Sequence, residues 1–304
     1  MKVTVLGAAG FIGGATVDAF ERLHTRVAVH GMVRTSPLHD RPAPASLHVG
    51  DVRNPLSLRD AVRGADCVLH CASYIGYDPD LCQSVNVVGT RNVVEACASE
   101  RVRRIVYVST AAVYRGGPRR GQTESELIVE PFSTLSRSRA QAEQIVLNAG
   151  GIVLRPDMVF GRGDRWFIPA LHRFTASIGG LVDGGSTRMS MIHVEDLGEM
   201  VASVALSDEA ETGAFNIAYD EPVSVRSIAQ LFPVLPAFAG SLPGVARDVA
   251  FERATQQGFT EHQFSLLTTD HWFNTERLAR VTSPQRNRGP HTFQRDTDWY
   301  RDAI

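Results

Sequence analysis

A glycine-rich turn at the start of the chain limits the possible folds more than any other feature. A short apolar run over residues 3–6 is followed by Gly7, Gly10 and Gly13 at G-x-x-G-x-x-G spacing, and mainly apolar residues at helical spacing come next. Gly7 would allow a tight turn, Gly10 the close approach of a pyrophosphate, and Gly13 close packing of the helix on the strand. Free N–H groups at a helix N-terminus attract phosphate. The turn therefore predicts a strand–turn–helix unit that binds a dinucleotide; the alternative is the same turn without a ligand.

Strand and helix signals alternate along the chain. Apolar runs predict strands at residues 27–33, 47–49, 65–72, 105–108, 151–155, 189–194 and 214–218. Helical spacing predicts helices at residues 55–62, 85–99, 137–148, 165–178 and 195–206, and glycine and proline predict a loop over residues 115–121. This alternation predicts an α/β fold with a Rossmann-type, doubly wound parallel sheet and right-handed crossovers.

The pattern becomes less regular near residue 156, which suggests two parts. Residues 1–155, together with about 194–218, are expected to form the dinucleotide-binding Rossmann domain. Residues 156–193 and 219–304 are expected to form a smaller, mostly C-terminal α/β region that binds the substrate.

The composition argues against several classes of protein. The 304 residues carry a net charge of −2, so no basic excess points to nucleic acid, and no stretch of about 18 apolar residues could span a membrane. Four cysteines without a C-x-x-C pair favour reduced thiols over a metal site, and the immediate start of a strand argues against a signal peptide. Lys2 is the only lysine, so no interior ammonium is available for catalysis. We expect a cytoplasmic protein with a small-molecule substrate and no metal.

Seven short motifs follow one another in an order that resembles the extended short-chain dehydrogenase/reductases, the NAD(P)-dependent epimerase/dehydratase group. They are the glycine turn, Gly50–Val52, His70–Ser73, Asn86–Asn92, Val108–Tyr114, Leu154–Gly161 and His193–Asp196, and they cover nearly the whole chain. The resemblance implies an NAD(P)-dependent enzyme. It also implies a homodimer through helices 85–99 and 137–148, although the apolar faces of these helices could equally be buried within one chain.

The resemblance also implies which residues surround the cofactor. Asp51 and Val52 would flank the adenine, and Ala72 and Ser73 would lie along the ribose and phosphates. Arg34, at the end of the second strand, could pair with the 2′-phosphate of NADP, whereas NAD enzymes have an acidic residue there; an ordinary surface arginine is the alternative. NADP(H) is therefore favoured over NAD(H). The expected cofactor-binding residues are Gly7, Ala9, Gly10, Phe11, Ile12, Gly13, Arg34, Ser36, Asp51, Val52, Cys71, Ala72, Ser73, Arg139 and Pro156.

The catalytic motif implied by the resemblance is altered. The family uses a serine or threonine after the fifth strand to orient the substrate oxygen, and a Tyr-x-x-x-Lys motif to move the proton and hold the ribose. Thr110 matches the first position. Alignment on Ser138 and Glu143 places Leu135 at the tyrosine and Arg139 at the lysine. Arginine keeps the positive charge, but leucine has no proton to give, which would cost about 10²–10⁴-fold in rate unless another group takes over.

Two tyrosines are candidate replacements for the missing acid. Tyr74 and Tyr77 follow the fourth strand, at the sheet edge where ligands bind in such folds; a pocket-lining role is the alternative. His193 is interpreted as structural. Substrate contacts are expected at Thr110, Ala111, Asp157 and Arg162.

Three functions are compatible with the sequence. The first is an NADP-dependent reductase or epimerase that uses a non-standard proton donor and acts on a carbonyl or alcohol of a sugar-like compound or secondary metabolite. The second, motivated by Leu135, is a non-redox cyclase, lyase or isomerase with a structural or absent cofactor. The third is a non-catalytic NADP-binding sensor or partner protein. Met189 stands where many sugar-nucleotide enzymes of the family have an arginine, which weakens the case for a nucleotide-sugar substrate.

Overall fold

A seven-stranded parallel sheet forms the centre of one part of the protein. The computed structural model describes residues 1–23, 26–35, 46–208, 211–282 and 296–304, so Ser36 lies outside the described residues. The strand order is β12-β7-β5-β4-β1-β2-β3, and every neighbouring pair is parallel. The strands are β1 (Lys2–Leu6), β2 (Ala28–Val33), β3 (Ser46–Val49), β4 (Cys67–His70), β5 (Arg104–Val108), β7 (Ile152–Pro156) and β12 (Gly213–Ile217).

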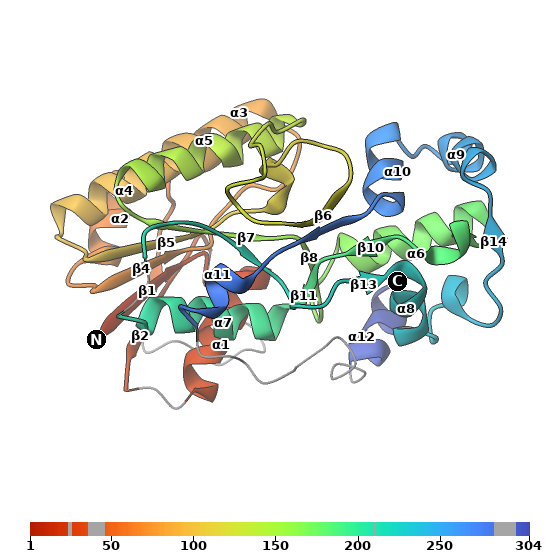
Figure 1. Ribbon diagram of the computed structural model, residues 1–304. Helices are drawn as coiled ribbons and strands as arrows, with labels where there is room; N and C mark the ends of the chain where they lie inside the picture. The colour runs from red at the N-terminus through yellow and green to blue at the C-terminus, as the bar shows by residue number, and fades with distance from the viewer. Residues whose placement is uncertain (24–25, 36–45, 209–210, 283–295) are drawn as a thin grey trace.

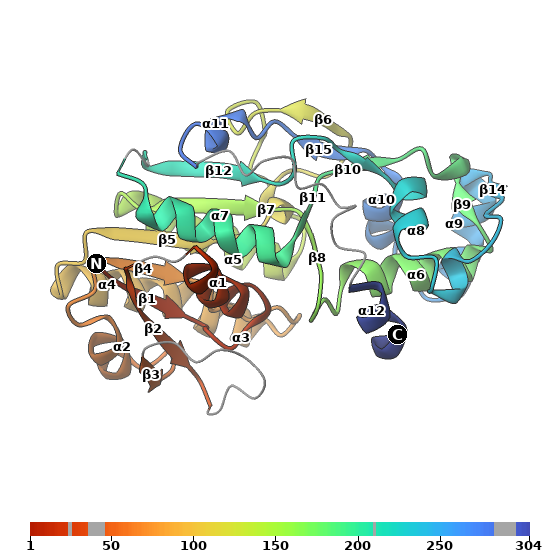
Figure 2. The ribbon, with the colours of Figure 1, turned by 90° about the horizontal axis from the view of Figure 1, so that it is seen from below.

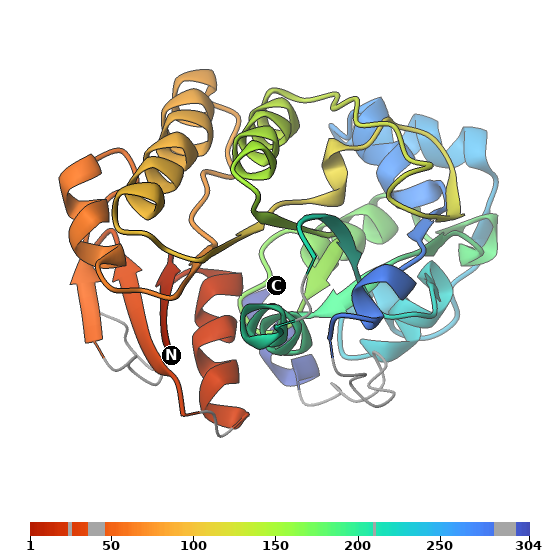
Figure 3. The same cartoon turned by 60° about the vertical axis from the view of Figure 1, so that its left-hand side comes forward.

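Helices cover both faces of this sheet, as Figure 1 and Figure 3 show. One face carries α1 (Phe11–Arg22) and α7 (Val194–Leu206), and the other carries α2 (Pro55–Val62), α4 (Gly89–Ser99) and α5 (Thr134–Asn148). A π-helical turn over Cys82–Val88 leads directly into α4. Because both faces are covered, β4 and β7 are buried along their whole length, which agrees with the apolar residues that begin both strands. The predicted doubly wound Rossmann-type fold is confirmed.

The second part of the protein contains a small mixed sheet in the order β13-β10-β15-β6. Its strands are β6 (Arg119–Gln122), β10 (Arg188–Met189), β13 (Val223–Ser224) and β15 (His271–Phe273). The predicted loop over residues 115–121 is therefore wrong for its last three residues. Strand β6 pairs with β15, far away in the sequence, and this tertiary pairing outweighs the local glycine signal.

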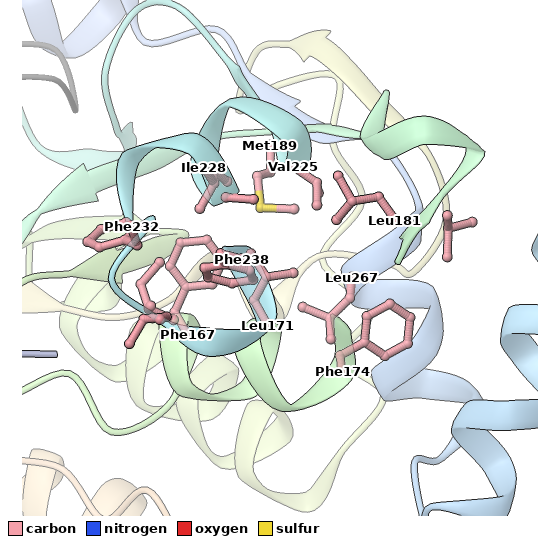
Figure 4. Packing of buried hydrophobic residues seen from close by; sticks show 14 of the residues in the cluster. Phe167, Leu171, Phe174, Leu181, Met189, Val225, Ile228, Phe232, Phe238 and Leu267 are labelled. Carbon is pink, nitrogen blue, oxygen red and sulfur yellow. The ribbon is translucent and has the colours of Figure 1, made fainter. Parts of the chain in front are cut away.

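Apolar and aromatic side chains from several helices form a separate core in this second part (Figure 4). Phe174 packs edge-on against Phe259 and Phe264, and Met189 is fully buried in the same cluster. The remaining helices are α3 (Pro79–Leu81), α6 (Phe167–Ile178), α8 (Val225–Leu231), α9 (Arg247–Gln256), α10 (Glu261–Thr268), α11 (Glu276–Ala279) and α12 (Thr297–Ala303). The remaining strands are β8 (Met158–Phe160), β9 (Leu181–Val182), β11 (Met191–His193) and β14 (Gly244–Val245), and 3₁₀ turns cover Ala111–Val113, Asp183–Gly185 and Pro236–Phe238.

The carboxyl ends of the central strands point toward the second part, as the arrows in Figure 2 show. The strand order reverses between β1 and β4, and ligands of open α/β sheets bind at this edge beside such a reversal. In the part of the chain that is described, no helix has the length and apolar character needed to cross a membrane.

Candidate active site

The glycine turn has the geometry of a phosphate-binding loop. Gly7 has φ +83°, and a Cβ atom at this position would lie 2.8 Å from the backbone nitrogen of Ala72. A Cβ on Gly13 would lie 2.2 Å from the carbonyl oxygen of Gly7, so α1 packs closer to β1 than any side chain allows. Gly10 is the N-cap of α1 and provides no side-chain cap, so the first N–H groups of the helix are left to a ligand. These positions fit a dinucleotide pyrophosphate.

A positively charged residue, Arg34, follows the end of β2 beside the glycine turn. Arg34 is exposed, and within the described ranges its guanidinium forms no hydrogen bond. Asp51 accepts hydrogen bonds from the backbone and guanidinium of Arg53, at 2.8 and 2.6 Å, and these bonds lower the pKa of its carboxyl group. Val52, expected at the adenine, is buried. Arg34 is therefore available to bind an anionic group at this end of the site.

Thr110 and Leu135 lie at the starts of a short turn and of a helix. The hydroxyl oxygen of Thr110 accepts a hydrogen bond from the backbone N–H of Ala112, at 3.1 Å, and so caps the 3₁₀ turn that follows β5. Ser133 and Ser136 form a reciprocal capping box at the start of α5. This cap places Leu135 in the first turn of the helix, where its half-buried side chain offers no proton.

Arg139 points into the protein. It is only 6% exposed, and its two terminal nitrogens donate to the hydroxyl of Ser73, at 2.6 Å, and to the carbonyl oxygen of Val108. The guanidinium lies 5.1 Å from the centre of the Tyr107 ring. Arg139 thus ties α5 to the ends of β4 and β5. Its role as the ribose-binding cation stays a prediction.

A group of buried polar atoms that the sequence did not reveal surrounds Arg139. Nε of Arg139, Nδ1 of His70 and the Ser109 hydroxyl are buried without a hydrogen-bond partner among the described residues. Nε2 of His70 lies 3.0 Å from the Thr90 hydroxyl. Burial, and next the charge of Arg139, lower the pKa of His70 to about 3. Because buried polar atoms normally find partners, this cluster has the character of a site for ordered water or a polar ligand group.

The two tyrosines after β4 point in other directions. The Tyr74 hydroxyl accepts a hydrogen bond from the backbone N–H of Asp78, at 3.4 Å, and lies directly against Gly76 in its own loop. Tyr77 is 69% exposed. Neither hydroxyl bonds to Thr110 within the described part of the chain. Their role as proton donors stays a prediction without a contact to support it.

The predicted substrate residues are divided between the protein interior and solvent. Ala111 is completely buried and packs with Tyr114 and Phe273, whereas Arg162 is exposed. Asp157 accepts a hydrogen bond at 2.7 Å from Nδ1 of His271 on β15, a partner that the sequence did not indicate. Pro156 is the last residue of β7 and is buried.

Two further buried side-chain contacts join distant segments of the chain. Arg155 forms an ion pair with Glu143 at 2.6 Å and donates a hydrogen bond to the buried Tyr114 hydroxyl at 3.0 Å. His193 caps α7 through Nδ1 and contacts Asp296 through Nε2 at 2.5 Å. No group of three or more potential metal ligands occurs within the described ranges.

Comparisons with known proteins agree with this arrangement. Residues 4–225 match the model of the 3-beta hydroxysteroid dehydrogenase/isomerase family. The chain belongs to this family. The match confirms the relationship to extended short-chain dehydrogenase/reductases that the motif order predicts.

Two relatives differ in how much of their length is matched. The chain is 32% identical over 195 residues to a decarboxylating sterol-4-alpha-carboxylate 3-dehydrogenase of Saccharomyces cerevisiae, and the alignment covers 57% of this chain and 55% of the relative. It is 28% identical to a 2-alkyl-3-oxoalkanoate reductase of Stenotrophomonas maltophilia, over 92% of this chain and 93% of the relative. The chain thus spans about half of the yeast relative and nearly all of the bacterial one.

A solved structure shares the whole fold. MoeE5 in complex with UDP-glucose and NAD aligns with a TM-score of 0.74 and 22% sequence identity, over 100% of this chain and 99% of that chain. This likeness shows the fold.

Proposed function

We propose that the protein is an NADP-dependent oxidoreductase that interconverts a ketone and a secondary alcohol. The turn formed by Gly7, Gly10 and Gly13 carries this proposal, because its close approaches to Ala72 and its uncapped helix N-terminus suit a pyrophosphate. Arg34 would bind the 2′-phosphate, and Thr110 would orient the substrate oxygen. When bound, the nicotinamide would supply the hydride chemistry; the chain would supply binding, orientation and the proton.

The surroundings of the site favour an apolar substrate skeleton among the sugar-like and secondary-metabolite alternatives. Met189 is fully buried in the core, and neighbouring Arg188 is exposed and donates to the carbonyl of Pro222, so neither supplies a cation for a diphosphate. Several large apolar side chains are exposed on the segments that follow β4, β6 and β8. They are Ile75, Tyr77, Ile128, Phe132 and Trp166. The names of the two relatives, one a sterol dehydrogenase and one an alkyl-oxoalkanoate reductase, support the same preference.

A second candidate is a non-redox isomerase or lyase. The half-buried Leu135 side chain at the tyrosine position favours it, because it removes the usual proton donor. We also propose that the protein is a cytoplasmic homodimer. Residues 156–193 and 219–304 would bind the substrate.

Nucleotide titration followed by single turnover tests the proposal. NADPH should bind more tightly than NADH, as measured by calorimetry. Bound NADPH should then be oxidised when 3-oxo lipids or alkyl 3-oxo acids are added. Product formation without a change in the redox state of NADPH would favour the second candidate.

A further inference from the structure

Reduction of a ketone needs a proton at the oxygen atom, and Leu135 cannot give one. The Thr110 hydroxyl is a poor acid. The Tyr74 hydroxyl accepts a hydrogen bond from Asp78, and Tyr77 is largely exposed. Another acid at the carboxyl edge of the sheet would have to take over. Asp157 and His271 form a buried acid–base pair at this edge, with side chains that are 8% and 2% exposed.

The contacts of His271 show that this pair holds a proton. Nε2 lies 2.9 Å from the carbonyl oxygen of Leu266, which can only accept, so Nε2 carries a hydrogen. Nδ1 lies 2.7 Å from Oδ2 of Asp157, and two lone pairs would repel at this distance. One further proton therefore lies between the two side chains. The pair is either imidazolium with carboxylate or neutral imidazole with carboxylic acid, and the two side chains share this proton.

Asp157 and Thr110 follow neighbouring strands of the central sheet. Strands β5 and β7 are parallel neighbours with Val108 opposite Leu154, and the backbone N–H of Ser109 donates to Leu154 at 2.7 Å. Thr110 lies two residues after the end of β5, and Asp157 directly follows Pro156, the last residue of β7, so both residues lie at the carboxyl edge where ligands of such sheets bind. Among the described residues, no group donates a hydrogen bond to Oδ1 of Asp157. This oxygen is free to meet a substrate atom.

We infer that Asp157 is the catalytic acid and base of this site in place of the missing tyrosine, and that His271 is the positioning residue that shares its proton. This inference rests on the proposed oxidoreductase function. In reduction, the nicotinamide of the proposed function would supply the hydride to the carbonyl carbon, the C=O π pair would move to oxygen, and the Asp157 carboxyl would give that oxygen its proton. Asp157 is left as a carboxylate beside neutral His271. The Nε2–H group of His271 stays hydrogen-bonded to the carbonyl oxygen of Leu266, and a proton from solvent restores the pair. Alcohol oxidation reverses each step.

Charged groups around the pair do not compete for its proton. Arg119 lies opposite His271 on β6, and its guanidinium faces the Phe273 ring. Asp270, next to His271 in the chain, accepts hydrogen bonds from the guanidinium of Arg120 and the backbone N–H of Arg188. Arg188 itself is exposed. Asp270 therefore offers a matched control, since it is an aspartate of the same strand region with other partners.

Asp157→Asn is the decisive variant because asparagine keeps an acceptor for Nδ1–H and removes the acid. We expect kcat for ketone reduction to fall about 10²–10⁴-fold with unchanged NADPH affinity and melting temperature. The fall of wild-type kcat as pH rises through the titration of the pair should disappear. The double variant Leu135→Tyr, Asp157→Asn should have a kcat at least about tenfold higher than Asp157→Asn alone. Asp270→Asn should leave kcat and its pH profile unchanged.

A readout independent of activity uses nitrogen-15 NMR of the histidine rings. Asp157→Asn should lower the titration midpoint of His271 by about one pH unit or more, because a neutral amide no longer stabilises the imidazolium. An unchanged midpoint, or an Asp157→Asn enzyme with wild-type kcat and pH profile, would overturn the inference while leaving the proposed function intact. Tight NADPH binding with product formed and no NADPH oxidised would instead overturn the proposed function and, with it, this acid role.

Discussion

Gly7→Ala tests whether the glycine turn holds the cofactor. The positive φ of Gly7 alone costs an alanine about 1–2 kcal/mol. The added Cβ would also meet the nitrogen and Cα of Ala72 at 2.8 and 2.9 Å. These are backbone atoms that cannot rotate away, so β1 and the end of β4 must separate by about 1 Å to reach normal contact distance. Such a displacement at a phosphate-binding turn should weaken NADPH binding at least about 100-fold.

Gly64→Ala is the matched control. Gly64 also has a positive φ, of +68°, but a Cβ there would meet nothing within 4 Å. We expect it to lose about 1–2 kcal/mol of unfolding free energy in urea and to keep wild-type affinity for NADPH in a fluorescence titration. If Gly7→Ala binds NADPH as the wild type does, the turn is not the pyrophosphate site and the reasoning fails.

Three further predictions follow from other contacts. Arg34→Ala should weaken NADPH binding about 10–100-fold and leave NADH binding unchanged in calorimetry, because only NADPH carries the 2′-phosphate; equal losses for both nucleotides would refute this role. Glu143→Ala should cost about 3–5 kcal/mol in urea unfolding, since it leaves the guanidinium of Arg155 buried and unpaired; a loss below about 1 kcal/mol would contradict this. Burial lowers the pKa of His70 to about 3, so between that pH and about 6.5 this histidine binds a proton only in the unfolded state. Acidification should therefore lower the unfolding free energy of the wild type by up to about 1.4 kcal/mol per pH unit relative to His70→Gln. If the unfolding free energies of the two proteins change in parallel with pH, this prediction is wrong.

The sequence was most informative where function depends on local order. The spacing of Gly7, Gly10 and Gly13 predicts the turn because each glycine acts within one strand–turn–helix unit. The assignment of Leu135 to the tyrosine position followed from the family resemblance, through the spacing of Ser138 and Glu143 on the same helix. Buried parallel strands can also be recognised in the sequence, because both of their faces are mainly apolar.

Contacts between distant segments could not be predicted. Asp157 and His271 lie 114 residues apart, and nothing near either residue in the sequence indicates the other. The inward orientation of Arg139 depends on its contacts with Ser73, in the loop after β4, and with Val108, at the end of β5. The sequence predicts that His70 belongs to a buried strand. Only the packed structure shows that its unpaired ring nitrogen lies near the charge of Arg139.

The most direct test of the account follows bound NADPH and product in the same single turnover with a 3-oxo lipid. The account predicts that one equivalent of NADPH is oxidised for each secondary alcohol formed, with deuterium from labelled NADPH on the carbinol carbon. Product that forms while NADPH stays reduced and the label stays on the nucleotide would contradict it.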